Sequence, residues 1–153
     1  MKTLMDPVTE ADTRFRLRQL QVTTPPRWGK TTAARVVLHL ADVFSFPAGG
    51  TTAAPPDAGL LAKYPLLRRW HTMSFPCADR RALVVEGDQP PDLAAWKGQA
   101  QACQDACTRF VTRLRSPGGP PLAPHPVFGP LSGEEWAQLL YLHVDHHLRQ
   151  FGV

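Results

Sequence analysis

Residues 132–151 of the 153-residue chain, SGEEWAQLLYLHVDHHLRQF, are the stretch that decides the fold. Ser132 and Glu135 are spaced as a capping box, in which each side chain can satisfy a backbone N–H at the start of a helix. At about 100° per residue, the large apolar side chains share one face: Trp136, Leu139, Leu140, Val144 and Phe151. The stretch therefore predicts a long helix packed against a core.

Three of the six histidines lie within this helix. His143 and His147 are four residues apart on the apolar face, where their Cβ atoms would lie about 5–6 Å from each other, whereas His146 lies at its edge. Burying both as neutral imidazoles would cost about 1–3 kcal/mol for each ring nitrogen left without a partner, and one cation satisfies both rings. We therefore predict that His143 and His147 bind a metal ion and that His146 does not. Hydrogen-bonded core histidines are the alternative.

Two helices are predicted in the first third of the chain. The first covers residues 7–21, because the aspartate and proline at 6–7 suit an N-cap and a first turn, and its apolar stripe comprises Val8, Ala11 and Phe15. The second covers residues 31–46 behind the caps Thr31 and Thr32. His39 adjoins the apolar side of this second helix, which is formed by Val36, Leu40 and Val43.

A further helix is predicted over residues 92–115, where apolar positions step by four and three. Cys103 and Cys107 lie in its core stripe. Their spacing could suit a metal, but small buried apolar side chains are the commoner explanation. Before this helix, residues 47–91 are rich in proline and glycine and predict an irregular excursion with one helix near 58–71.

Four long helices without a period-two strand pattern predict an all-α fold, a four-helix bundle with an irregular Pro/Gly-rich insertion. A chain of 153 residues, 43% of them apolar, suits one domain over residues 1–153. No apolar run approaches the ~20 residues of a membrane span, and the first residues lack a secretory pattern. Three cysteines, an odd number, suit a reducing compartment. We therefore expect a cytoplasmic protein.

The formal charge of +4 raises the question of a polyanionic partner. The basic residues are scattered, and Arg14, Arg16 and Arg18 alternate at a spacing of two, which spreads them around a helix. A solvated surface is the better interpretation, so we expect neither a nucleic-acid nor a membrane partner. The exposed helix faces of such a bundle allow a homodimer.

Several segments resemble a known superfamily. The sequence HPVFGPLSGEEW at 125–136, followed by HVDHHLRQF at 143–151, looks like an uncharacterised branch of the DinB-like metalloenzyme superfamily. The upstream RWGK at 27–30 and LHLAD at 38–42 resemble the same superfamily, as do residues 1–7. The resemblance spans most of the chain except residues 47–91.

The resemblance implies a single DinB-like bundle of the up-down-down-up type that binds a divalent metal. One histidine of the second helix and a His-x-x-x-His pair of the last would be the ligands, which here implies His39, His143 and His147. The superfamily includes thiol-dependent transferases and isomerases. The resemblance therefore implies a small-molecule substrate, such as a low-molecular-weight thiol.

Three histidines without a fourth protein ligand leave a position open to water or substrate, as in catalytic zinc sites. Three imidazoles suit several divalent ions, and we favour zinc or nickel. Asp42 and Gln150, each three residues beyond a predicted ligand, are placed to orient the ligand rings. A solvated residue at a helix edge is the alternative for each.

Two histidines lie outside this set. His125 precedes a proline in the segment that leads into the last helix and is a candidate fourth ligand or proton carrier. His71, beside Trp70 in the irregular excursion, has no recognisable partner and is expected at the surface.

Two hypotheses about function follow. The first is a divalent-metal-dependent enzyme with an open three-histidine site. We favour a thiol-dependent S-transferase or isomerase over a hydrolase. The alternative is a non-catalytic metal-binding or stress-associated helical module that engages a protein partner. An open site favours the enzyme, whereas a closed four-ligand site favours the module.

Overall fold

The computed structural model describes residues 2–49, 91–116, 118, 121–125 and 128–153. In these ranges the regular elements are four α-helices and one short 3-10 helix: α1 (Pro7–Gln19), α2 (Ala33–Ser45), η1 (Phe46–Ala48), α5 (Leu93–Arg115) and α6 (Gly133–Phe151). The described ranges contain no strand, only an isolated bridge between His125 and Gly129. The predicted all-α fold is confirmed.

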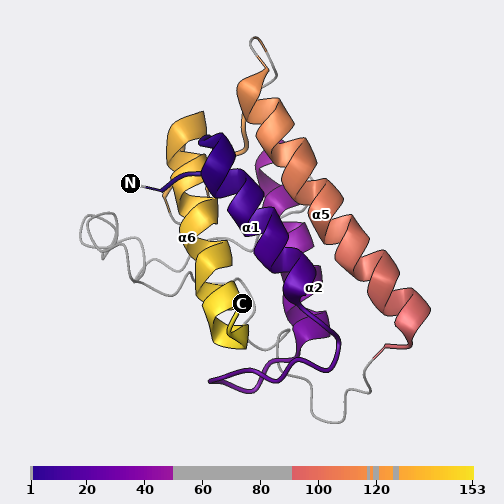
Figure 1. Ribbon diagram of the computed structural model, residues 1–153. Helices are drawn as coiled ribbons and strands as arrows, with labels where there is room; N and C mark the ends of the chain where they lie inside the picture. Colours follow the sequence, from indigo (N-terminus) through magenta and orange to yellow (C-terminus); the bar gives the residue numbers. More distant parts are fainter. Residues whose placement is uncertain (1, 50–90, 117, 119–120, 126–127) are drawn as a thin grey trace.

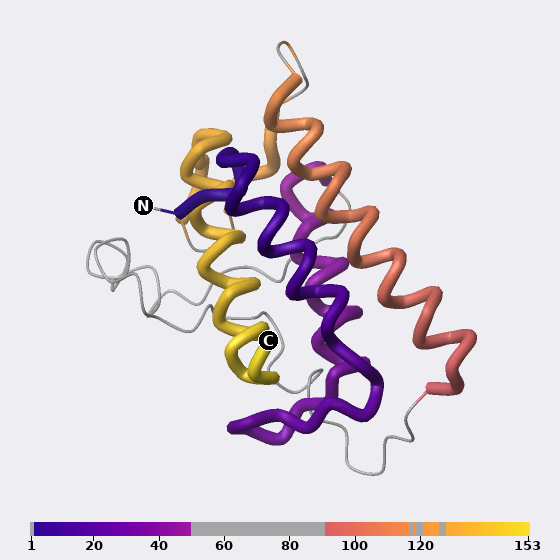
Figure 2. Tube along the Cα trace, viewed as in Figure 1, coloured from indigo at the N-terminus to yellow at the C-terminus, as the bar shows by residue number. Residues whose placement is uncertain are grey.

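The four helices form a bundle in which α1 and α6 lie beside the pair α2 and α5 (Figure 1). α1 and α6 run in one direction and α2 and α5 in the other, which is the up-down-down-up arrangement, as the Cα trace shows (Figure 2). The parallel pair α2 and α5 makes the most extensive contact between helices. Small buried residues on both helices, such as Ala34 and Ala106, allow backbones to approach closely.

The predicted helix starts are confirmed by their caps. The side chains of Asp6 and Thr32 accept hydrogen bonds from the backbone N–H groups three residues later. Ser132 and Glu135 form the full capping box of α6. Asp92 caps α5 in the same way. Satisfied N–H groups at these positions fix where each helix begins, so the observed starts lie within two residues of the predicted ones.

The core lies between the helices and draws on all four. The predicted apolar face of α6 is confirmed, because Trp136, Leu140, Val144 and Phe151 are buried and Leu139 is half-buried. α2 and α5 contribute further fully buried side chains, including Val36, Leu40, Phe44 and Phe110. α6 is therefore held on one face by apolar packing, which places His143 and His147 inside the bundle.

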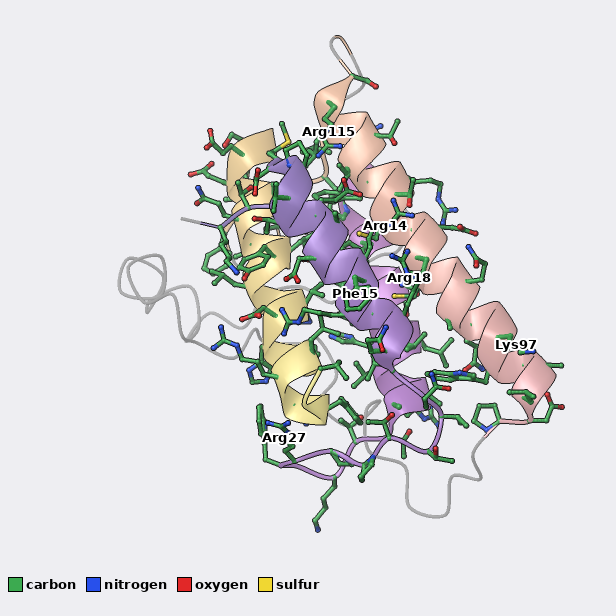
Figure 3. All side chains as sticks on the ribbon, viewed as in Figure 1. Arg14, Phe15, Arg18, Arg27, Lys97 and Arg115 are labelled. Atoms are coloured by element: carbon green, nitrogen blue, oxygen red, sulfur yellow. The ribbon has the colours of Figure 1, made fainter. Side chains whose placement is uncertain are left out.

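The predicted apolar stripe of α1 faces solvent and not the core, so this prediction was wrong. Val8 is 77% exposed and Phe15 is 56% exposed, and Figure 3 shows Phe15 on the outer side of the helix. The buried residues of α1 are Thr9, Thr13 and Leu17. Thr13 can be buried because its hydroxyl donates to the Thr9 carbonyl at 2.8 Å, a local bond that the hydropathy pattern does not reveal.

Arg16 also departs from the predicted solvated surface. Its Nη1 lies 2.8 Å from the Oδ1 atom of Asp145 on α6, and its Nη2 donates to the Val153 carbonyl at 2.9 Å. This charge-assisted pair joins α1 to the last helix. By contrast, Arg18 is exposed.

The predicted helix near 58–71 and His71 fall outside the described residues, as does most of the predicted 47–91 excursion. Residues 46–48 of the described part form η1. None of the helices that the structure describes combines the length and apolar character needed to cross a membrane.

Candidate metal centre

Three histidines meet between α2 and α6. His39 is half-buried on α2, and His143 and His147 are buried one turn apart on α6. The Nε2 atoms of His39 and His143 lie 2.8 Å apart, and the three residues each offer one ligand atom within 4.8 Å of the others. The structure therefore brings together the three histidines that the sequence selected.

The spacing of the ring nitrogens suits a metal ion. Nitrogens bound tetrahedrally at 2.0–2.1 Å would lie about 3.3 Å from each other. The cluster has one pair at 2.8 Å and all its ligand atoms within 4.8 Å. The expected separation lies between these two values.

Burial keeps these imidazoles neutral. It lowers the pKa of His39 to about 4, with a further contribution from the charge of His147. Burial likewise lowers the pKa of His147 to about 4, against the hydrogen bond to Gln150, which raises it. The pKa of His143 falls well below its ordinary value for the same reason, reinforced by the neighbouring histidines. Neutral rings have a nitrogen lone pair at pH 7, which is what a metal ligand needs.

Gln150 contacts the ring of His147, the predicted ligand three residues before it. Its Oε1 atom lies 3.0 Å from Nδ1 of His147, and its Nε2 donates to the Trp28 carbonyl oxygen at 3.0 Å. Asp42 is exposed, and among the described residues no hydrogen bond joins its carboxylate to His39. A residue three positions beyond a ligand can project to solvent, and at Asp42 it does.

A family model described as "Protein of unknown function (DUF1569)" matches residues 6–152. The chain belongs to the DUF1569 family. No curated protein and no solved structure matches it. Because the match reaches from α1 to the end of α6, it includes every residue of the histidine cluster.

His125 of this DUF1569 chain is buried but lies outside the three-histidine cluster. Its Nδ1 accepts a hydrogen bond from the backbone N–H of Phe128 at 3.2 Å, and its ring stacks on Phe128 with centroids 4.6 Å apart. The Trp136 ring lies 5.2 Å away. Burial lowers the pKa of His125 to about 4. These contacts hold the imidazole between its own loop and Trp136 of α6.

His146 is exposed, as expected for a residue at the edge of the apolar face. Its ring meets the Trp28 ring edge-on with centroids 6.1 Å apart, and it is not a member of the cluster. The structure thus separates adjacent histidines of this DUF1569 chain, one turned to solvent and one turned inward.

Asp145 is a buried residue between the two ligand positions that sequence reasoning missed. Its carboxylate pairs with Arg16 at 2.8 Å and with Arg149 at 2.6 Å. The spacing of four residues between Asp145 and Arg149 is the sequence signal that could have revealed this pair. A carboxylate held by two guanidinium groups faces α1 rather than the cluster.

Cys103 and Cys107 are buried in α5, as their place in the core stripe predicted. Burial raises the pKa of each thiol to about 12. Both therefore stay protonated at pH 7 and behave as small apolar side chains. Among the residues described in this DUF1569 chain, the one group with metal-binding spacing is the histidine cluster.

Proposed function

We propose that His39, His143 and His147 bind one divalent metal ion and that the protein is a metal-dependent enzyme. The observation that carries the proposal is the convergence of three imidazoles from two helices, with ligand atoms within 4.8 Å of one another. Burial that keeps all three neutral supports it. Zinc or nickel is the ion that we favour for such a ligand set.

A metal ion explains the cluster better than hydrogen bonds between the rings. A neutral imidazole has one donor and one acceptor nitrogen. The contact between Nε2 of His39 and Nε2 of His143 can form only when one of these atoms has a proton. One cation at the centre would satisfy a lone pair from each ring at once.

Among the described residues the group has three ligands and no fourth, which favours a catalytic site over a closed structural one. Asp145 is engaged by Arg16 and Arg149, and His125 is engaged by the N–H of Phe128. Neither belongs to the group of ligand atoms around the centre. A divalent ion bound by three imidazoles would supply a Lewis acid that polarises a substrate and lowers the pKa of a bound water or thiol.

The reaction class that we propose is a thiol-dependent S-transfer or isomerisation, in preference to a hydrolysis. Its support is the resemblance to the DinB-like superfamily, which implies a low-molecular-weight thiol as substrate. Cys103 and Cys107 are not available as thiolates at pH 7, because burial raises the pKa of both to about 12. Neither of these two cysteines can therefore supply the reactive sulfur, and the resemblance implies that it comes from the substrate.

Titrating the cobalt-substituted protein with several small thiols tests this proposal. Direct binding of a thiol should produce a sulfur-to-metal charge-transfer band, and His147→Ala should abolish it together with the bound cobalt. If cobalt binds stoichiometrically and no thiol produces the band, the thiol-type enzyme is excluded. The non-catalytic metal-binding module would then be the better account.

A further inference from the structure

A chain of hydrogen bonds leads from the backbone of Trp28 to the imidazole of His147. Gln150 lies between them, with Nε2 3.0 Å from the Trp28 carbonyl oxygen and Oε1 3.0 Å from Nδ1 of His147. A carbonyl oxygen only accepts hydrogen bonds, so the amide NH₂ of Gln150 must face it. The amide oxygen is then directed to the ring. Because this oxygen also only accepts, Nδ1 of His147 must have the proton.

We propose that this relay of Trp28, Gln150 and His147 holds His147 in the Nδ1–H tautomer and makes Gln150 and Gly29 positioning residues of the metal centre. A neutral imidazole has a proton on only one nitrogen, so the relay leaves the lone pair on Nε2. That nitrogen is then the one able to bind an ion. The effect on metal affinity rests on the proposed function, whereas the tautomer exists without a metal.

Gly29 belongs to the relay because of the space that it leaves open. Its φ is +79°, in the left-handed region that favours glycine, and an added Cβ would lie 2.9 Å from the Nε2 atom of Gln150. A methyl group at this position would therefore press on the same nitrogen that donates to the Trp28 carbonyl. The amide could then not keep both of its hydrogen bonds.

The segment that contains Gly29 is anchored to the end of α6. The backbone N–H of Arg27 donates to the Gln150 carbonyl at 2.6 Å, and Arg27 Nη2 lies 3.4 Å from the Gly152 carbonyl. Figure 3 shows Arg27 beside this end of the helix. Two segments far apart in the sequence are thus joined at the residue that orients a predicted metal ligand. The loop at 27–29 therefore acts on the centre without touching it.

Nitrogen NMR of the metal-free protein tests the tautomer directly. Long-range proton–nitrogen correlations should show His147 protonated on Nδ1 in the wild type. Gln150→Leu removes the acceptor and should abolish the preference. Gln150→Glu supplies a carboxylate acceptor for the Nδ1 proton and should restore the preference, although it cannot donate to the Trp28 carbonyl. A wild-type His147 protonated on Nε2, or an unchanged tautomer in Gln150→Leu, would overturn the relay.

Zinc affinity, measured by competition with a chromophoric chelator, tests the consequence for the centre. Gln150→Leu should weaken zinc binding about 10–100-fold, the usual effect of losing a partner of a metal-bound histidine. Gln150→Glu should recover most of this loss. Equal zinc affinity in Gln150→Leu and the wild type would overturn the positioning role.

Gly29→Ala has a matched control in Gly49→Ala. Gly49 has a similar φ of +84°, but an added Cβ there meets nothing within 4 Å. We expect Gly29→Ala to weaken zinc binding and Gly49→Ala to leave it unchanged. The losses from Gly29→Ala and Gln150→Leu should also be non-additive, because both act through one amide. Equal losses in the two glycine variants would assign the effect to backbone strain and remove Gly29 from the relay.

The two measurements separate this inference from the proposed function. A wild-type protein that binds no zinc, yet keeps the Nδ1–H tautomer of His147 and loses it in Gln150→Leu, would overturn the metal centre and support the relay. A protein that binds zinc equally well with and without the Gln150 amide would support the centre and overturn the relay.

Discussion

Two pairs of residues in this bundle have the same spacing and different surroundings. His143 and His147 on α6 and Cys103 and Cys107 on α5 are each four residues apart, and all four side chains are buried. Histidine and cysteine are both common zinc ligands. The histidine pair meets His39 from another helix, and His147 contacts Gln150. The cysteine pair belongs to no group of three among the described residues.

Spacing on a helix therefore identifies two candidate metal ligands, but it does not by itself make a metal site. Completion needs a third ligand from a different element and a polar partner that fixes the protonation of a ligand ring. Burial has opposite consequences for the two pairs. It lowers the pKa of the histidines and so keeps their lone pairs available. It raises the pKa of the thiols to about 12 and so suppresses the thiolate.

The largest expected effect is the loss of metal from the histidine pair. His143→Ala or His147→Ala should weaken zinc binding by more than the ~10–100-fold typical of an outer partner, because two imidazoles hold an ion far less tightly than three. Cys103→Ala and Cys107→Ala should bind zinc as the wild type does. Isothermal titration with zinc measures both effects. Loss of zinc binding in a cysteine variant would show that the cysteine pair is needed for the metal.

A smaller effect is expected on stability at the cysteine pair. Cys107 is 0% exposed, so Cys107→Ser would bury a hydroxyl, at a cost of about 1–3 kcal/mol if it finds no acceptor. Cys107→Ala introduces no polar group and should cost less. Urea unfolding of the metal-free protein gives both values. A serine variant more stable than the alanine variant would show that the surroundings of Cys107 are polar.

The pH dependence of stability offers a further test at His125, a buried histidine outside the cluster. Burial lowers its folded-state pKa to about 4, whereas the unfolded chain takes up the proton near pH 6.5. The unfolded state therefore binds more protons between these values, and the wild type loses stability as the pH falls through that window. His125→Asn keeps an acceptor for the Phe128 N–H and removes the titration.

Urea unfolding of metal-free protein at pH 7.5 and at pH 4.5 measures this difference. From pH 7.5 to pH 4.5, the free energy of unfolding should fall more in the wild type than in His125→Asn. Equal losses would mean that His125 is protonated as readily in the folded protein as in the unfolded chain.

The smallest expected effect is at His146, which is adjacent to a proposed ligand but exposed. His146→Ala should leave zinc stoichiometry and affinity unchanged, because the side chain is not among the clustered ligands. Its contact with Trp28 is an edge contact at 6.1 Å. A large loss of zinc in this variant would show that α6 presents a different face to the centre.

The sequence predicted the elements whose signals are local. The cap at Ser132 and the apolar face of α6 fixed that helix and turned His143 and His147 inward, and both features are present in the structure. His39 came from a resemblance to known sequences, because no local rule pairs a residue of α2 with one of α6. The structure then placed its Nε2 atom 2.8 Å from that of His143.

Sequence reasoning missed one local bond within α1 and several contacts between distant segments. The exposed stripe of α1 was misjudged because Thr13 is buried through a bond to its own helix, while Phe15 is left outside. Asp42 and Gln150 have equivalent offsets from a ligand, yet only Gln150 meets a backbone carbonyl brought from residue 28. Tertiary contacts of this kind decide which of two similar positions orients a ring.

X-ray absorption at the zinc edge of zinc-loaded protein tests directly whether His39, His143 and His147 bind the ion. We predict one zinc per chain with three imidazole nitrogens at about 2.0–2.1 Å. His39→Ala should remove the contribution of one imidazole from the spectrum. Sulfur at about 2.3 Å, in protein prepared without added thiol, would place the ion at cysteines. That result would contradict a metal centre built from His39, His143 and His147.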